Sequence, residues 1–270
     1  LIKSLFQKLN TKNFELIMQQ LDNFCEIVEI FSDDKTLVPK IKAVSEKLKN
    51  SLIDAVKELH PEHVFKVPEE KSQACIQFLQ EYLNKNGLVF STNYDLLLYW
   101  VLMRNGADNA IDGFGRDLET DLDDGHYVEP DDLEYSELRW GKYKEEQTVY
   151  YLHGTLPIFD TGINIVKAQY DEEHYLLQNV KDRIDKKEYP IFVTAGNGKE
   201  KLTHIMHNKY LSFCYDQLCN IEGSLVTFGF NFGEYDTHII DAINVAAKMG
   251  RKIPDKLWSV YIGVYSDENL

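Results

Sequence analysis

The sequence of 270 residues predicts an α/β fold, in which a parallel β-sheet is covered by helices on both faces. Three observations carry this prediction. Short apolar runs rich in β-branched and aromatic residues recur along the chain, as buried strands require. Between several of these runs, apolar residues are spaced by three and four positions, which is typical of helices. Residues 1–85 show only the helical spacing, so we expect a helical layer before the first strand.

The expected helical layer contains three helices, two of which have clear ends in the sequence. The second helix ends before His60-Pro61, because a proline cannot continue a helix. The third ends at Asn86-Gly87, a common helix stop. The three expected helices are Phe14–Phe31, Val38–Leu59 and Glu69–Leu83.

Five short apolar runs are expected to form the sheet, and helices are expected between several of them. The expected strands are Leu88–Thr92, Thr148–Leu152, Pro190–Thr194, Ser224–Phe228 and Leu257–Val264. The expected helices are Asn93–Met103, Asp171–Lys186, Lys199–Asn220 and Asp236–Met249. We expect one domain over residues 1–270, because a chain of this length can surround a single core.

The composition excludes some classes of partner. Asp and Glu number 44 against 29 Lys and Arg, so the formal net charge is −15. Proteins that bind nucleic acid need a basic surface to displace counterions from phosphates, so no such partner is expected. The sequence has no run of 18 apolar residues and no signal peptide, so we expect a cytoplasmic protein that does not cross a membrane.

Metal binding is not expected either. The four cysteines include one close pair, Cys214 and Cys219, whereas a structural zinc site usually shows two close pairs. We therefore expect free thiols in a reducing compartment. His204 and His207 lie three positions apart on an expected helix with no third ligand nearby, which favours surface residues over ligands.

Residues 105–147 form an acidic insertion between an expected helix and the next strand. The insertion holds 14 acidic and 4 basic residues, a balance of −10, which leaves −5 for the other 227 residues. A solvated loop is the favoured interpretation. A lid over a site and a cation-binding loop stay open, although Asp121, Asp123 and Asp124 lack the glutamate of a calcium loop.

Polar residues and glycines gather where the expected strands end. Ligands of open parallel sheets bind just beyond the carboxyl ends of the strands. The segments at these positions are Asn93-Tyr94-Asp95, His153-Gly154, Gly196-Asn197-Gly198-Lys199, Gly229-Phe230-Asn231 and Tyr265-Ser266. The pattern predicts a site at this edge of the sheet.

Each of these residues also has a purely structural interpretation. His153 is either a buried structural histidine or a catalytic base. Asn93 and Asp95 can cap the following helix, since both residue types favour that position. Asn231 can be a turn residue, and the Gly196–Lys199 segment is either an ordinary turn, which we favour, or a phosphate-binding turn.

Taken together, three segments resemble the sirtuin-like family, and specifically its prokaryotic NAD-hydrolysing branch found in anti-phage defence proteins. The segments are Ser91-Thr92-Asn93-Tyr94-Asp95, Leu152-His153-Gly154 and Gly229-Phe230-Asn231-Phe232-Gly233-Glu234-Tyr235-Asp236-Thr237-His238-Ile239. The resemblance covers roughly residues 88–265 and implies a Rossmann-like sheet. The paired-cysteine zinc module of the family's deacetylases is absent from the sequence, which argues against protein deacylation.

The resemblance implies an NAD glycohydrolase, with NAD as the substrate. Asn93 would position the attacking water or the ribose, and His153 would act as general base or bind the ribose hydroxyls. The residues implied to line the dinucleotide are Thr92, Tyr94, Asp95, Gly154, Gly229, Phe230 and Asn231. The family analogy also implies a homo-oligomer or a complex with a regulatory partner protein, in which the enzyme acts as a regulated effector.

Two departures from the family pattern support an alternative. The family places Ser where this chain has Asn231, and its opening glycine-rich strand and loop are expected upstream of Leu1 or lost. The alternative is a catalytically inactive nucleotide sensor or scaffold subunit with the same fold. A plain structural α/β domain for assembly is the third interpretation.

Overall fold

The computed structural model confirms an α/β protein. It describes residues 2–10, 14–32, 34–59, 61, 64–116, 118–119, 134–135, 137–168, 176–186, 188–193 and 197–264. Where one domain was expected, the chain divides into two compact units, which are described separately: the first reaches Phe192 and the second begins at Val193. Within the described residues, no helix is both long and apolar enough to cross a membrane.

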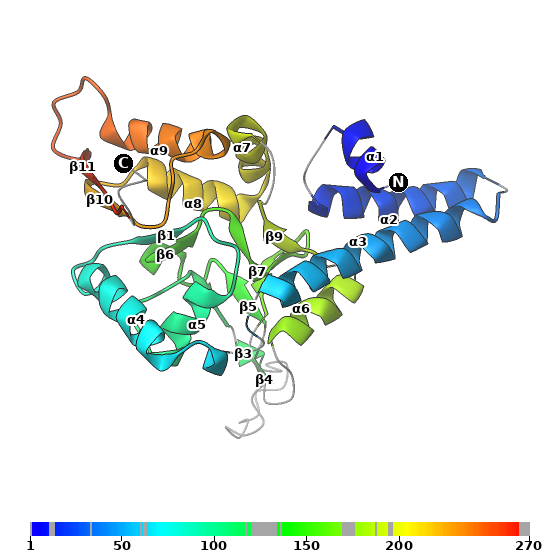
Figure 1. Ribbon diagram of the computed structural model, residues 1–270, viewed down its shortest axis with the longest axis horizontal. Helices are drawn as coiled ribbons and strands as arrows, with labels where there is room; N and C mark the ends of the chain where they lie inside the picture. The colour runs from blue at the N-terminus through cyan, green and yellow to red at the C-terminus, as the bar shows by residue number, and fades with distance from the viewer. Residues whose placement is uncertain are drawn as a thin grey trace, which may run out of the picture. The chain divides into compact units, whose positions relative to one another are not determined.

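The first unit opens with the three expected helices, preceded by a short helix that was not expected, in blue to cyan in Figure 1. They are α1 (Ile2–Lys8), α2 (Phe14–Phe31), α3 (Leu37–Leu59) and α4 (Glu69–Leu83), with a 3₁₀ turn at Val64–Lys66. The predicted stop after α4 is confirmed: Asn86 adopts the left-handed conformation with φ 58°. At Gly87 a Cβ would lie 2.8 Å from the carbonyl oxygen of Tyr82, so the turn has no room for a side chain.

Two of the expected strands pair in parallel in the first unit. Strand β1 (Val89–Ser91) lies beside β6 (Val149–Tyr151), with Ser91 opposite Tyr151. Helix α5 (Leu97–Arg104) follows β1. It begins four residues later than expected, because Asn93 to Leu96 form a loop whose backbone bonds to other residues.

The other strands of the first unit differ from the expectation. Five form a sheet in the order β2-β5-β8-β7-β9, and every pair in it is antiparallel. Its strands are β2 (Phe114–Gly115), β5 (Leu138–Trp140), β7 (Gly154–Asp160), β8 (Ile165–Lys167) and β9 (Pro190–Phe192). The expected strand at Pro190 therefore pairs antiparallel with β7 rather than joining a parallel sheet.

The remaining elements of this unit lie around that sheet or within the insertion. They are β3 (Leu118–Glu119), β4 (Glu134–Tyr135), a 3₁₀ turn at Lys144–Glu146 and α6 (Leu176–Asp185). The β3 and β4 strands pair antiparallel. Asp121, Asp123 and Asp124 of the acidic insertion lie outside the described residues.

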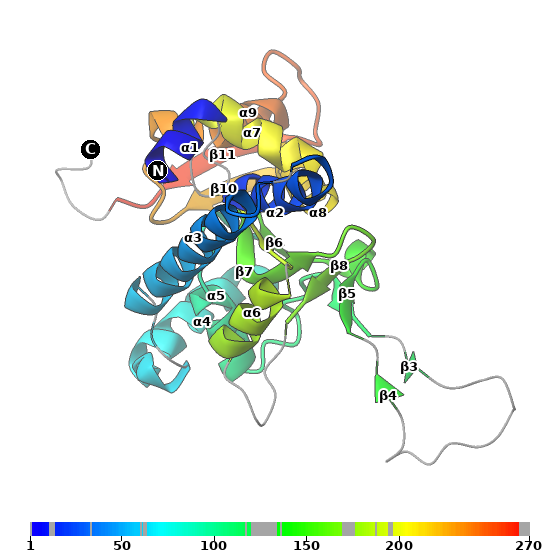
Figure 2. The same ribbon diagram turned by 90° about the vertical axis from the view of Figure 1, so that its right-hand side faces the viewer.

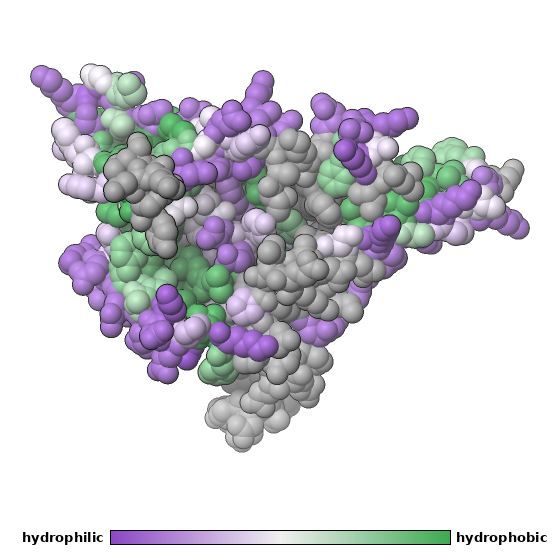
Figure 3. Space-filling model, viewed as in Figure 1, coloured by the Kyte–Doolittle hydropathy of each residue, from purple (hydrophilic) through white to green (hydrophobic). Residues whose placement is uncertain are grey.

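The helical layer packs on the protein's own sheet. Ile17 of α2 and Leu48 of α3 belong to one apolar core with Phe159 of β7 and Ile184 of α6. Figure 2 shows α3 and α6 near β7. The opposite side of α2 carries exposed apolar residues, and hydrophobic surface is visible along the α2–α3 pair in Figure 3. These exposed residues are Phe24, Ile27, Ile30 and Phe31.

The described residues of the second unit form three helices and a parallel strand pair. Its elements are α7 (Gly198–His207), α8 (Lys209–Cys219), β10 (Gly223–Thr227), a 3₁₀ turn at Glu234–Asp236, α9 (Thr237–Ala247) and β11 (Leu257–Ile262). Strands β10 and β11 are parallel, as expected. The single helix expected over Lys199–Asn220 is two helices, because the side chain of Asn208 accepts hydrogen bonds from Tyr210 N and Leu211 N and starts α8.

Candidate functional site

The predicted site residues of the first unit lie at the carboxyl ends of the parallel strands β1 and β6. The hydrogen-bond ladder continues one step past the strands, where Leu152 N donates to Ser91 O at 2.8 Å. The residue after Ser91 is Thr92, and the residue after Leu152 is His153. The structure therefore brings the segments around Asn93 and His153 together, although they lie about sixty residues apart in the sequence.

His153 is buried, with 4% of its surface exposed. Its ring atom Nδ1 lies 3.1 Å from the carbonyl oxygen of Thr92. A carbonyl can only accept a hydrogen bond, so we assign the proton to Nδ1. In the neutral ring the other nitrogen, Nε2, then carries the lone pair and can accept a proton. This arrangement is both a satisfied buried histidine and an oriented base, so the geometry is compatible with either interpretation of His153.

Asn93 is exposed in the loop that joins β1 to α5, which we call the Asn93 loop (Thr92–Leu96). Its backbone N–H donates to Ser91 Oγ at 3.1 Å, which forms a tight turn at the end of β1. Within the described part of the chain, the side-chain amide of Asn93 makes no hydrogen bond. The backbone of Asn93 is fixed by this hydrogen bond and the residue is exposed, so its side-chain amide can bind a ligand.

Strand β7 holds the Asn93 loop in place through Thr155, a residue that sequence reasoning missed. Thr155 Oγ1 lies 3.2 Å from Tyr94 O and 3.0 Å from Asp95 O. Leu156 N also donates to Tyr94 O, at 3.0 Å. The only sequence signal was the place of Thr155 directly after His153-Gly154, on a strand that was not predicted.

Tyr94 and Asp95 also have structural tasks in the loop. The ring of Tyr94 stacks on Phe192 of β9 with centroids 5.9 Å apart. Asp95 Oδ1 accepts from Leu97 N at 2.9 Å, at the first residue of α5. This bond satisfies the first N–H of α5, although the N-cap residue is Leu96 and its side chain makes no capping bond.

Gly154 is required by close packing. Its backbone has φ +73°, and an added Cβ would lie 2.0 Å from the carbonyl oxygen of Ile191 in β9. The contact allows β7 to pass close to β9 immediately after His153. Gly154 is therefore explained by packing, whether or not a ligand also approaches its backbone.

Gly229, Phe230 and Asn231 lie in the second unit, in the loop after β10 that we call the Asn231 loop (Phe228–Gly233). Asn231 Oδ1 accepts from Gly233 N at 3.0 Å, which confirms the turn interpretation. Gly229 has φ +67° in open space, so its backbone conformation, rather than crowding, favours glycine. The Phe230 and Phe232 rings meet edge to face at 4.8 Å.

The Asn-Gly segment before α7 is a helix start. Asn197 accepts from Glu200 N at 3.0 Å and its own N–H donates to Glu200 Oε2 at 2.8 Å, which is a capping box. A Cβ on Gly198 would lie 1.9 Å from Thr237 Oγ1 of α9. Asn197 and Gly198 therefore begin a helix and do not form the ordinary turn that was favoured, while Gly196 lies outside the described residues.

An ion pair holds the start of α9 in the second unit. Lys201 Nζ lies 2.7 Å from Asp236 Oδ1, and both side chains are largely buried. The next residue but one, His238, is 1% exposed. Burial lowers the pKa of His238 to about 4; Lys201 acts in the same direction, and the carboxylates of Asp236 and Asp241 oppose it. His238 is thus neutral near pH 7.

A family model matches residues 1–266 of the chain, and its description is a domain of unknown function (DUF4917). The match includes the β1 and β6 strand ends and the Asn231 loop. No curated protein and no solved structure matches the chain.

Proposed function

We propose that the chain, which belongs to the DUF4917 family, is an NAD glycohydrolase with a sirtuin-like, Rossmann-like arrangement. The observation that carries the proposal is the hydrogen bond from buried His153 to Thr92 O, beside the exposed Asn93. It sets a base with a defined tautomer next to an available amide, at the ends of two parallel strands. The resemblance of three sequence segments to NAD-hydrolysing sirtuin-like proteins supplies the substrate.

The proposed reaction breaks the bond between nicotinamide and ribose. The electron pair of that bond moves to the pyridinium nitrogen of NAD⁺, so nicotinamide leaves neutral and the ribose passes through an oxocarbenium-like state. A water oxygen then bonds to the ribose carbon, and the proton it loses is accepted by Nε2 of His153. The products are nicotinamide, ADP-ribose and a proton.

Asn93 is assigned the positioning of the water or of the ribose hydroxyls. A neutral amide can donate to one oxygen and accept from another, so it suits a water that must be oriented without being charged. The hydrogen bonds from Thr155 and Leu156 hold the Asn93 loop before substrate arrives, which reduces the entropy lost on binding. Thr92, Tyr94, Asp95 and Gly154 would line the same edge.

By the family resemblance, we also propose Gly229, Phe230 and Asn231 as contacts of the dinucleotide. We further propose that the enzyme is a cytoplasmic effector of anti-phage defence, regulated by self-assembly or by a partner protein. These parts of the proposal rest on the family resemblance alone.

The first test measures by chromatography how much nicotinamide the purified full chain releases from NAD. The second test measures the NAD content of cells that express the chain and are challenged with phage. His153→Ala and Asn93→Ala should each lower turnover by about 100-fold or more, the usual loss for a removed base or orienting group. His207→Ala is a matched control, because His207 Nδ1 also contacts a backbone carbonyl, Thr203 O at 2.6 Å, but on the exposed face of α7. Asn244→Ala, an exposed asparagine on α9, is the control for Asn93.

One observation favours the inactive sensor as a second candidate. The amide oxygen of Asn231 is engaged with Gly233 N, where the family pattern places a serine. A sensor would bind NAD without releasing nicotinamide, and Asn93→Ala and His153→Ala would leave its biological activity unchanged. The sensor would be supported, and the hydrolase rejected, if the folded protein binds NAD and the NAD content of expressing cells stays unchanged after phage challenge.

A further inference from the structure

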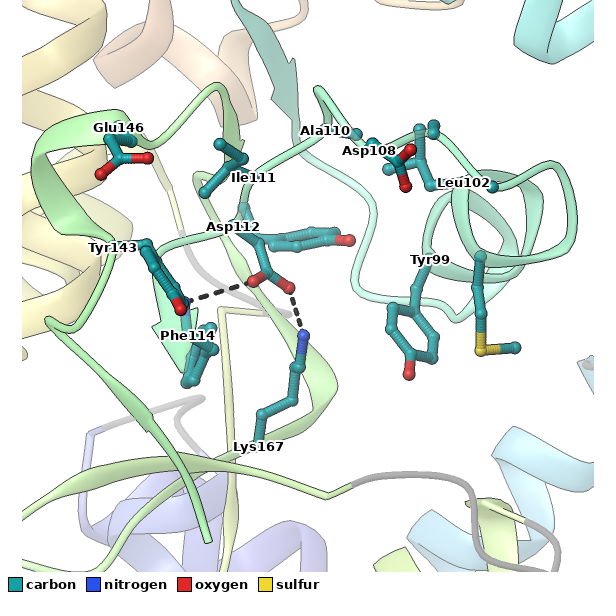
Figure 4. Close-up of a pocket in the computed structure, with 14 residues that line it drawn as sticks. Tyr99, Leu102, Asp108, Ala110, Ile111, Asp112, Phe114, Tyr143, Glu146 and Lys167 are labelled. Carbon is teal, nitrogen blue, oxygen red and sulfur yellow. Dashed lines mark hydrogen bonds and ion pairs between the residues drawn. The ribbon is translucent and has the colours of Figure 1, made fainter. Parts of the chain in front are cut away.

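The first unit contains a pocket that is separate from the residues assigned to catalysis. It has a volume of about 470 Å³, in the range typical of small-molecule sites. Its walls come from α5, the segment 106–112, β2, the turn at 143–146, and the strands β6 and β8. Figure 4 shows Asp112 and Lys167 meeting across the middle of the view, with Tyr99 on one side and Phe114 on the other.

The segment 106–112 is fixed by hydrogen bonds, so this wall of the pocket is preformed. Thr148 Oγ1 donates to Asn109 O at 2.7 Å and accepts from Ile111 N at 2.9 Å. Ile111 O in turn accepts from the backbone N–H groups of Thr148 and Val149. A Cβ on neighbouring Gly113 would lie 2.4 Å from Gln147 Oε1, so the chain is packed closely there as well.

The charges of the lining favour a cation. Among the described residues that line the pocket, Asp108, Asp112 and Glu146 are acidic and Lys167 is the one basic residue, so their sum is 1 − 3 = −2. Lys167 is already paired with Asp112, and the two side chains are 10% and 17% exposed. An anionic ligand would therefore meet no unpaired cation in this lining, whereas a cation would meet Asp108 and Glu146.

Aromatic side chains complete the argument. The ammonium of Lys167 lies 5.2 Å from the ring centres of both Tyr99 and Phe114, so these walls already stabilise a positive charge. Tyr151 also lines the pocket and is 2% exposed. Within the described part of the chain its hydroxyl makes no hydrogen bond, so a ligand in the pocket can bind to it.

We propose that this pocket binds a small organic cation, an amine on an apolar or aromatic body. The apolar body would pack on the Tyr99, Leu102 and Phe114 walls, and the ammonium would bind the hydroxyl oxygen of Tyr151. The carboxylates of Asp108 and Glu146, which lie on opposite sides of the pocket in Figure 4, would attract the cation to it. All three acidic lining residues belong to the acidic insertion. The proposal does not depend on NAD hydrolysis.

The test measures binding to the full chain by titration calorimetry with three probes of similar shape. They are 2-phenylethylamine as the cation, 2-phenylethanol as the neutral form and 3-phenylpropionate as the anion. We expect the amine to bind at least tenfold tighter than either of the other two, and to weaken as salt rises because the attraction is electrostatic. Equal affinity for the three probes, or no binding of the amine at millimolar concentration, would overturn the proposal.

Near-isosteric variants locate the binding. The double substitution Asp108→Asn with Glu146→Gln should weaken the amine at least tenfold, and Tyr151→Phe should weaken it about fivefold by removing one hydrogen bond. Glu145→Gln is the control, because Glu145 is an exposed neighbour outside the lining and should leave affinity unchanged. If thermal unfolding shows a variant to be unfolded, Ala110→Leu, which fills the pocket from its rim, replaces it and should abolish binding. Amine binding that survives both kinds of change would place the site elsewhere and reject the proposal.

Discussion

The Asn93 loop and the Asn231 loop begin alike but are built differently. Each follows a strand of a parallel pair and carries an asparagine that the sequence marked as a ligand contact. In the first, neighbouring residues hold the backbone and the amide of Asn93 stays exposed. In the second, the amide oxygen of Asn231 itself closes the turn on Gly233 N. Thus an asparagine at a strand end is available for chemistry only when other groups stabilise its loop.

The largest effect should come from breaking the packing behind the Asn93 loop. Gly154→Ala introduces a Cβ 2.0 Å from Ile191 O at a residue with φ +73°, so it should lower the free energy of unfolding by more than about 3 kcal/mol. Gly162→Ala is the control: its φ is +82°, but no atom lies within 4 Å of the added Cβ, so only the backbone strain of about 1 kcal/mol remains. Chemical denaturation measures both, and equal losses would refute the packing role of Gly154.

Acid should affect the helix behind the Asn231 loop. His238 has a pKa of about 4 in the folded chain against an ordinary value of 6.5, so between these values the unfolded chain binds the extra proton. Stability should be fully present above about pH 6.5 and fall on acidification toward pH 4, by on the order of 3 kcal/mol at most.

Hydrogen exchange of α9 amides as a function of pH measures this dependence. The groups around His238 that also carry charge are Asp236, Lys201 and Asp241. A His238→Gln variant should lose the part of the slope between pH 6.5 and pH 4 that the wild-type chain shows. An unchanged slope would mean that other groups cause the acid sensitivity.

Removing the Thr155 hydroxyl, which holds the Asn93 loop, should have a moderate effect on stability and turnover. Thr155→Val keeps the shape of the side chain but loses the hydroxyl that contacts Tyr94 O and Asp95 O, which should cost about 1–2 kcal/mol. Amide exchange in the Asn93 loop should rise, and nicotinamide release should fall about tenfold as the loop loses its order. Thr203→Val, which removes an exposed hydroxyl bonded to Lys199 O within α7, should change neither.

The smallest expected effects on stability distinguish the two asparagines from each other. Asn231→Ala removes the bond to Gly233 N and should cost about 0.5–1 kcal/mol of stability. Asn93→Ala removes no hydrogen bond of its own side chain within the described residues and should leave stability within about 0.5 kcal/mol. Thermal unfolding of the two variants should therefore rank them in the opposite order to their expected effects on NAD turnover.

Structural features that depend on residues close together in the sequence could be predicted correctly. Helices α2 and α4 match their predicted bounds, because apolar spacing and the Asn86-Gly87 stop act within a few residues. The meeting of the Asn93 and His153 segments could also be predicted, since both follow strong strand signals. Asn208 shows the limit of this approach: the helix expected across it is interrupted by a cap that periodicity does not reveal.

Pairing between distant strands could not be predicted in the same way. The antiparallel contact of β7 with β9 depends on Gly154 passing close to Ile191, and no local pattern announces it. The clamp at Thr155 and the pocket around Lys167 were missed for the same reason, because both depend on which strands become neighbours. Tertiary packing, rather than propensity, determines these features.

The hydrogen bond between His153 and Thr92 joins residues that lie 61 positions apart in the sequence, one on each side of the acidic insertion. Loop-closure entropy depends only on the logarithm of the length. Deleting residues 120–133 would alter the cost of closing this segment by only about 0.2 kcal/mol. By loop closure alone, a change in the number of residues between Thr92 and His153 carries almost no penalty for the contact of the two strand ends. The length of this connection is therefore a variable with which evolution, or an engineer, can add a new control over an old site.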